Sequence, residues 1–172
     1  MTPEFSRPER IDAIGDGERR ITIAADATER AAVAARFGLL AIDRLEATLA
    51  VRRQNGGIEV RGTVSATVTQ ACSITGDPLP VSMDEPVALQ FVESLDGAEE
   101  VELGEDALDT IEIEGGAIDL GEAAAETLAL ALDPFPRSPR AAAALQEAGV
   151  IAEDEFKPVT ALSGLKSLLE KK

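Results

Sequence analysis

The sequence contains no histidine, tryptophan or tyrosine and only one cysteine, Cys72. Without histidine, neither a Ser-His-Asp nor a Cys-His catalytic site can form. Thiolates and imidazoles supply nearly all ligands of tetrahedral zinc sites, so such a site is excluded within one chain, as is a disulfide. The five phenylalanines are the only aromatic residues, so the core of this 172-residue chain must consist mainly of Ala, Val, Leu and Ile.

Long apolar segments are also missing. The longest runs, such as residues 127–132, are far shorter than the roughly 20 residues that a membrane helix requires. The chain starts without an apolar leader, and a single cysteine is typical of a reduced compartment. We therefore expect a cytoplasmic protein that does not enter a membrane and needs neither a metal nor a disulfide to fold.

Lysine and arginine are absent from residues 62–136, although this stretch contains seventeen of the 32 Asp and Glu residues. The formal net charge of −16 arises here, because the rest of the chain is nearly balanced. An acidic surface repels nucleic-acid phosphates and favours a basic partner, of which ribosomal proteins are abundant examples. The alternative is that the charge only maintains solubility. The candidate partner-binding residues are Glu99, Glu100, Glu102, Glu105 and Asp106.

Alternation of apolar and polar residues predicts the β-structure. It extends over residues 45–51 and resumes over residues 58–69, and between them residues 54–57 include the Asn-Gly pair that favours a tight hairpin. A third alternating run, residues 81–91, follows a turn at residues 75–78. These runs predict three antiparallel strands in meander order.

Two segments have the composition and end signals of helices. The first, residues 27–37, is rich in Ala and has Thr28 as a candidate N-cap. The second, residues 119–132, has Asp119 as N-cap and an apolar stripe. The predicted fold class is α+β: an antiparallel meander, or a partly closed barrel-like sheet, packed by these two main helices, with an acidic loop over residues 93–109 and a helical C-terminal tail.

Composition divides the chain into three parts. Residues 1–18 contain Pro, Gly and scattered charges without periodicity, and we expect a flexible N-terminal arm. Residues 19–136 form the α+β core. Residues 137–172 form a helical C-terminal extension, with an Ala-rich helix at residues 141–148 and a terminal turn or helix at residues 163–169.

A small basic group lies near the expected hairpin tip. Arg52, Arg53 and Arg61 would form a positive patch there that is able to touch RNA phosphates. No aromatic residues accompany them to stack on bases, so this is the weaker of the two candidate contact sets.

Cys72 and two acidic pairs are the remaining candidates for a catalytic or metal-binding site. Cys72 lacks a resolving cysteine and any nearby Lys or Arg, so we interpret it as a structural, half-buried cysteine. The pairs Glu99-Glu100 and Glu105-Asp106 lie among Gly and Ala and lack the spacing of a calcium loop, which favours a solvated loop over a metal or acid-base site. No cofactor-binding motif is present, and we expect no catalytic residue and no metal.

The segment QACSITGDPLPVSMDEPVALQFV resembles the bacterial YceD family, the large ribosomal RNA subunit accumulation proteins. The paired strands before Cys72, the later segment IDLGEAAAETLALALDPFPRSP and the lysine-ended C-terminus resemble that family in the same order. The matching motif residues are Cys72, Pro78, Phe91, Asp119 and Leu120. Family members usually have a second cysteine three residues after the first, whereas Thr75 stands here, which resembles the alphaproteobacterial variant.

The resemblance implies a role in 23S ribosomal RNA accumulation or processing, and hence in assembly of the large ribosomal subunit. It carries no catalytic residue, so we expect a non-enzymatic factor whose acidic face binds a basic ribosomal protein or an assembly factor, with ribosomal RNA contacted indirectly. Two alternatives remain open. One is a metal-dependent RNA-processing enzyme that uses Asp and Glu, and the other is a small-ligand binding module with a pocket lined by Val64, Leu89 and Phe91.

Overall fold

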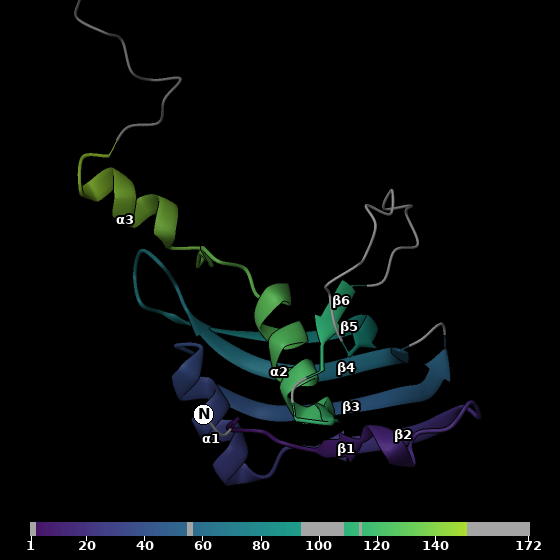
Figure 1. Cartoon of the computed structure of the whole chain (residues 1–172). Coiled ribbons are helices and arrows are strands. Elements are labelled where there is room, and N and C mark those ends of the chain that lie inside the picture. The colour runs from purple at the N-terminus through teal and green to yellow at the C-terminus, as the bar shows by residue number, and fades with distance from the viewer. Residues whose placement is uncertain (1–2, 55–56, 94–108, 114, 151–172) are drawn as a thin grey trace, which may run out of the picture.

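The computed structural model of the chain describes residues 3–54, 57–93, 109–113 and 115–150. Figure 1 shows α2 crossing one face of a twisted sheet, while α3 points away from it. The elements in chain order are β1 (Pro8–Arg10), the short 3-10 helix η1 (Ile11–Ala13), β2 (Arg19–Ala24), α1 (Ala27–Arg36), β3 (Ala41–Gln54), β4 (Gly57–Ala71), β5 (Pro78–Val92), β6 (Asp109–Glu112), β7 (Ala117–Asp119), α2 (Leu120–Ala131) and α3 (Ala141–Glu147).

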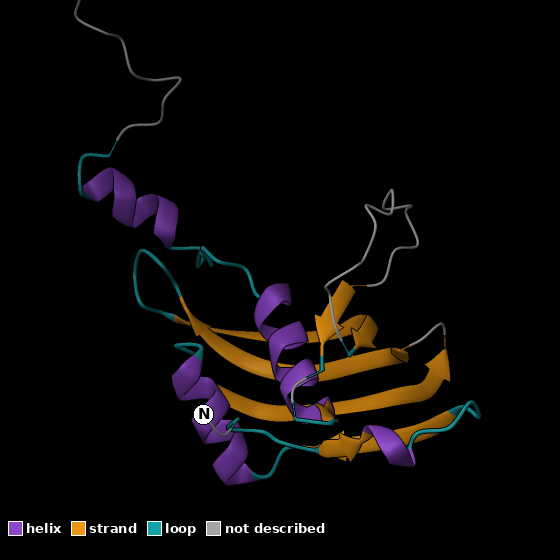
Figure 2. Ribbon diagram, in the orientation of Figure 1, coloured by secondary structure: helices purple, strands orange, loops and turns teal. Residues whose placement is uncertain are grey.

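The main sheet has the strand order β2-β3-β4-β5-β6. Strands β2 to β5 form an antiparallel meander, and β6 is added parallel to β5, with Phe91 opposite Ile111. The predicted α+β fold with an antiparallel meander is therefore confirmed. The sheet is open, as Figure 2 shows, rather than barrel-like.

The hairpin of β3 and β4 supplies most of the sheet's apolar face. Leu49 and Val51 of β3 and Val60 and Val64 of β4 are each 1% exposed or less, because alternate residues of a strand share a face. Burial of one such side chain contributes roughly 1.5–3 kcal/mol. The two long strands thus provide a rigid base for the helix and the acidic strands that follow.

The first main helix is capped two residues earlier than the sequence predicted. The Asp26 carboxylate, rather than Thr28, accepts hydrogen bonds from the N–H groups of Thr28 and Glu29, at 2.8 and 2.9 Å. The Glu29 side chain in turn accepts from the Asp26 N–H at 2.8 Å. This reciprocal arrangement satisfies three of the free donors at the start of α1.

The second main helix begins where the sequence predicted. The Asp119 carboxylate caps α2 by accepting from the N–H groups of Gly121 and Glu122, at 3.0 and 3.1 Å. Leu120, Ala124 and Leu128 are buried, and α2 packs on β4 and β5. The predicted apolar stripe therefore faces the sheet.

The N-terminal segment is packed, in contrast to the flexible arm that the sequence predicted. Phe5 is completely buried, and β1 pairs antiparallel with β7. Gly121 makes this approach possible, since a Cβ atom there would lie 2.5 Å from the Phe5 carbonyl oxygen. The Arg7 guanidinium lies 4.8 Å from the Phe5 ring centre and donates to Glu29 at 2.7 Å. One large aromatic side chain thus anchors a segment that has no hydrophobic periodicity.

The C-terminal extension is described as far as residue 150. The predicted Ala-rich helix is confirmed as α3 (Ala141–Glu147). The predicted turn or helix at residues 163–169 and nearly all of the predicted acidic loop lie outside the described residues. The three-part division of the chain stays a prediction.

Candidate functional site

Two adjoining cavities lie between α2 and the last strands of the sheet. They have volumes of about 450 and 270 Å³ and share Ile111, Ala123 and Glu126, so they form one open depression, which we call the α2 trough. Leu89 and Phe91 of β5 also line it. Its apolar lining is a consequence of strand alternation, which turns these β5 side chains toward the face that α2 only partly covers.

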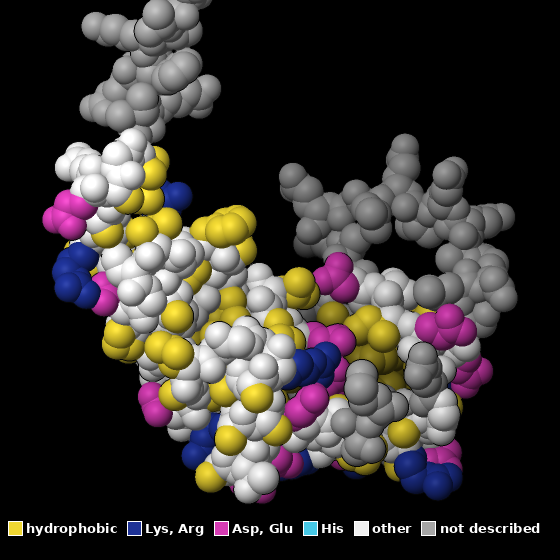
Figure 3. Space-filling model, turned by 90° about the vertical axis from the view of Figure 1, so that its left-hand side faces the viewer, with side chains coloured by type: hydrophobic (Ala, Val, Ile, Leu, Met, Phe, Trp, Pro, Cys, Tyr) yellow, Lys and Arg dark blue, Asp and Glu magenta, His cyan; other side chains and the backbone are white. Residues whose placement is uncertain are grey.

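Carboxylates border the α2 trough on both sides. Glu85, Asp109 and Glu126 line its larger part, and Glu112 lines its smaller part. None of these four carboxylates has an ion-pair partner among the described residues. Figure 3 shows hydrophobic side chains in a hollow, with acidic side chains and a Lys or Arg side chain at its border. Such a surface is suited to an apolar contact framed by positive charge.

The acidic residues proposed from sequence belong to the same stretch of chain. Glu99, Glu100, Glu102, Glu105 and Asp106 lie between β5 and β6 in sequence and outside the described residues. Their role in partner binding stays a prediction. Sequence reasoning missed the trough itself, since Glu85 and Glu126 are distant in sequence and come together only through the packing of α2.

The three arginines of the hairpin make internal contacts. Arg52 and Arg61 both donate to Glu59, the first at 2.9 Å, and Glu59 is 4% exposed. The hydrogen bond from Arg61 holds the pKa of Glu59 below its ordinary value although burial opposes this. Arg53 donates to the carbonyl groups of Ile11 and Ile14. The guanidinium groups therefore have structural partners, while the Arg52 and Arg61 side chains keep 40% and 56% of their surface exposed.

Cys72 lies in a tight turn that is held by hydrogen bonds from residues much later in the chain. Its Sγ accepts hydrogen bonds from the N–H groups of Ser138, at 3.2 Å, and Thr75, at 3.4 Å. The Asp77 carboxylate accepts from the Thr75 hydroxyl at 2.7 Å and from the Arg140 guanidinium. Ser138 and Arg140 follow Cys72 by more than 60 residues, so no local sequence signal could have identified them.

The turn changes the acidity of its two titratable groups. Burial raises the pKa of the Cys72 thiol, but donors at Thr75, Ser138 and Ile74 outweigh it and lower the pKa to about 6. The hydrogen bond from Arg140, with that from Thr75, lowers the pKa of Asp77 to about 2. The sequence around Cys72 contains no Lys or Arg that would lower its pKa. The fold lowers it instead through hydrogen-bond donors, which the sequence did not predict. Cys72 is 4% exposed, so it is a buried cysteine rather than a half-buried one.

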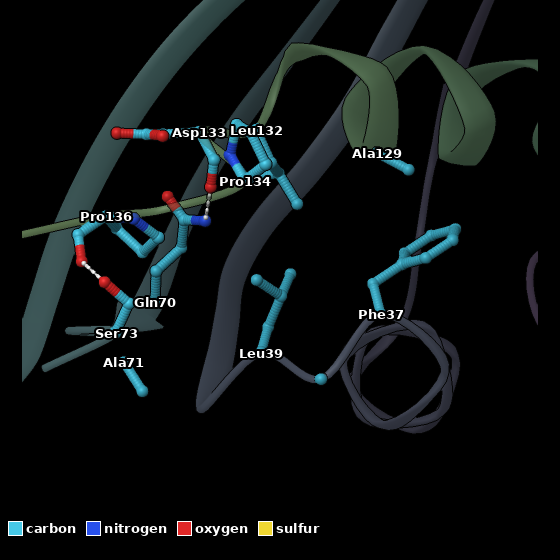
Figure 4. Close-up of a pocket in the computed structure, with 11 residues that line it drawn as sticks. Phe37, Leu39, Gln70, Ala71, Ser73, Ala129, Leu132, Asp133, Pro134 and Pro136 are labelled. Carbon is cyan, nitrogen blue, oxygen red and sulfur yellow. Dashed lines mark hydrogen bonds between the residues drawn. The ribbon is translucent and has the colours of Figure 1, made fainter. Parts of the chain in front are cut away.

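A separate cleft of about 380 Å³ lies beside this turn. Figure 4 shows Phe37 and Leu39 along one side, and Leu132 beside Asp133 and Pro134 on the other. On the other side, Gln70 donates to the Asp133 carbonyl at 2.9 Å and the Ser73 hydroxyl donates to the Pro136 carbonyl at 3.1 Å. These hydrogen bonds hold the chain after α2 against the end of β4. The polar groups of this cleft therefore stabilise the fold.

The pocket proposed from sequence for a small ligand forms only in part. Leu89 and Phe91 line the α2 trough, whereas Val64 is buried beneath the helix at 1% exposure and lines none of the cavities described above. The motif residue Pro78 begins β5, and Leu120 begins α2. Both motif residues therefore stand at the first position of an element.

Two general properties of the described residues bear on function. Within residues 3–54, 57–93, 109–113 and 115–150, no group of three or more Cys, Asp or Glu side chains is arranged to hold a metal ion. In the same part of the chain, no helix has the length and apolar character needed to cross a membrane.

Comparison with known proteins supplies the family. The model of the family described as large ribosomal RNA subunit accumulation protein YceD matches residues 60–169, which is more than half of the chain. The chain therefore belongs to the YceD family, as its motif residues suggested. The description gives that family a role in accumulation of the large ribosomal RNA subunit and names no enzymatic activity. No curated protein and no solved structure matches the chain.

Proposed function

We propose that this protein is a non-enzymatic factor that supports 23S ribosomal RNA accumulation and large-subunit assembly by holding a basic ribosomal protein or assembly factor on its acidic face. The observation that carries the proposal is charge segregation: residues 62–136 contain seventeen acids and no Lys or Arg. Family membership supplies the process, and the acidic surface supplies the class of partner.

The physical basis is electrostatic complementarity. Ribosomal proteins are strongly basic, and before they bind RNA their positive charge is not neutralised. An acidic surface attracts them over about one Debye length, near 8 Å at physiological salt. The same surface repels RNA phosphates, so ribosomal RNA would compete with the factor for its partner rather than bind beside it. Release of the partner onto RNA follows from that competition.

The test is a pull-down from cell lysate with the full chain, at low and high salt and with or without RNase. We expect basic large-subunit proteins to be retained after RNase treatment and lost at high salt. Partners that disappear with RNase would overturn the proposal and direct attention to Arg52, Arg53 and Arg61. A variant neutralised at the five predicted residues should capture less of the partner, whereas a control with the same charge change elsewhere should not. That control neutralises Asp16, Glu18, Asp43, Glu147 and Glu153.

A further inference from the structure

We infer that the α2 trough is the docking surface for a basic amphipathic helix of the protein partner. This inference rests on the proposed function and deepens it, because it names the surface and the kind of segment that binds there. It depends on described residues of β5, β6 and α2 rather than on the acidic residues between β5 and β6.

The first argument is the incomplete coverage of the sheet. Helix α2 buries Leu120, Ala124 and Leu128 against β4 and β5. Beyond it, Leu89 of β5 and Ile111 of β6 remain only partly buried. A second helix packed beside the first on one sheet face is a common way to complete an α+β layer. The open strip therefore has the position that such a helix would take.

The second argument is a second stripe on α2. Ala123, Glu126, Thr127 and Leu130 all line the trough, and their spacing of three, four and seven residues places them on one face of the helix. Leu130, the second-last residue of α2, is 87% exposed and leaves a large apolar side chain at the rim of the trough. The stripe offers an incoming helix an apolar contact at Leu130 and a carboxylate at Glu126.

The third argument is charge. Glu85 and Asp109 stand on the strand side of the trough and Glu126 on the helix side, and none has an ion-pair partner among the described residues. A helix with an apolar stripe flanked by Lys or Arg would place aliphatic side chains on Leu89 and Ile111 and its cations beside these carboxylates. An acidic or neutral helix would leave the carboxylates uncompensated at the edge of a low-dielectric surface, so the trough selects a basic one.

The experiment measures binding of a defined probe to the full chain. The probe is a peptide of about 18 residues made of Leu and Lys, with leucines at helical spacing, and its control is the scrambled isomer. The trough variant carries Glu85→Gln, Asp109→Asn and Glu126→Gln. The matched variant carries Asp16→Asn, Glu18→Gln and Asp43→Asn, which are exposed acids with the same charge change.

We expect the trough variant to bind the helical peptide about tenfold more weakly and the matched variant to change by less than about twofold. Leu130→Ser should weaken binding by roughly fivefold through loss of apolar contact. Equal weakening by both acidic variants, or equal affinity for the scrambled peptide, would overturn the inference, because either result means attraction by net charge alone.

A second arm separates this inference from the proposed function. Proteins extracted from purified large ribosomal subunits and freed of RNA are passed over the wild-type chain and both acidic variants. If the wild type and the trough variant retain the same basic proteins equally, the inference that the trough is the docking surface is wrong and the proposed function stands. If the wild type retains none while the peptide binding depends on the trough, the proposed function is wrong and the surface still recognises basic helices.

Discussion

In residues 1–61, six carboxylates lie in ion pairs with arginines of the same region. Among the residues of 62–136 that the structure describes, only Glu122 and Asp77 have an arginine partner, and each partner lies outside this stretch. Glu122 pairs with Arg36 and Asp77 with Arg140. The first region is electrically balanced, with ten Arg and ten acids, and the second has no cation at all.

The difference separates two uses of a carboxylate. In the first region carboxylates hold the chain together, as Glu29 does when it both caps α1 and pairs with Arg7. In the second region Glu85, Asp109 and Glu126 have no ion-pair partner among the described residues, and we expect them to contribute little to the fold. Paired or capping acids such as Glu29 thus serve the fold, whereas the unpaired acids of the trough are the ones that we propose for binding, so variants of the two groups should fail in different ways.

The largest effect is expected from Phe5→Ala. Removal of this fully buried ring should lower the free energy of unfolding by about 3–5 kcal/mol, because it leaves a cavity under α2 and β7. Urea unfolding followed by circular dichroism measures the change. Leu130→Ala, at an exposed apolar position of the second region, serves as control and should stay within about 0.5 kcal/mol of the wild type. A loss below about 1 kcal/mol for Phe5→Ala would mean that the N-terminal segment is as loosely held as its sequence suggested.

The second-largest loss of stability is expected from Glu59→Gln. This buried carboxylate compensates both Arg52 and Arg61, and its loss should cost about 2 kcal/mol, less than a fully buried pair because both guanidinium groups stay partly solvated. Its lowered pKa makes the contribution present above the unfolded value near pH 4.3 and lost as pH falls further. The difference from the wild type in urea unfolding should therefore shrink between pH 5 and pH 3 and would contradict this account if it persisted unchanged.

Local patterns were sufficient for the parts of the fold that local physics determines. Alternation over residues 45–51 and 58–69 predicted the hairpin of β3 and β4, and the carboxylate of Asp119 predicted the start of α2. The packing of Phe5 could not be predicted, since one apolar residue among polar neighbours has no period. The parallel addition of β6 to β5 was equally hidden, because alternation defines a strand but not its non-local partner.

The sequence predicted that the candidate site is acidic, but it did not predict the shape of the site. The absence of Lys and Arg from residues 62–136 indicated an acidic surface, and the structure adds the trough that Glu85, Asp109 and Glu126 border. These three positions are brought together by α2 lying beside β5 and β6. No sequence period relates them, so only the folded chain reveals them as one site.

The turn at Cys72 is where the second region and the C-terminal extension meet, and Thr75→Val tests how the turn is held. Loss of the hydroxyl, which is among the groups that lower the pKa of Cys72 to about 6, should raise that pKa, measured by thiolate absorbance at 240 nm. Because the folded pKa is lowered, the thiolate stabilises the protein above the unfolded value near 8.5, and this is lost as pH falls to 6. Thr63→Val, on the exposed side of β4, is the control. An unchanged titration would show that backbone donors alone set the acidity.

The smallest effect on stability is expected from the trough variant with Glu85→Gln, Asp109→Asn and Glu126→Gln. These carboxylates have no ion-pair partner among the described residues, so their neutralisation should leave the free energy of unfolding within about 0.5 kcal/mol of the wild type. At low salt the variant should become slightly more stable, because repulsion within a region that contains only acids is relieved, and this gain should vanish at about 1 M salt. Urea unfolding at both salt concentrations measures it. A loss comparable to that of Glu59→Gln would show that the carboxylates of the second region also hold the fold, and the division between structural and binding acids would then be wrong.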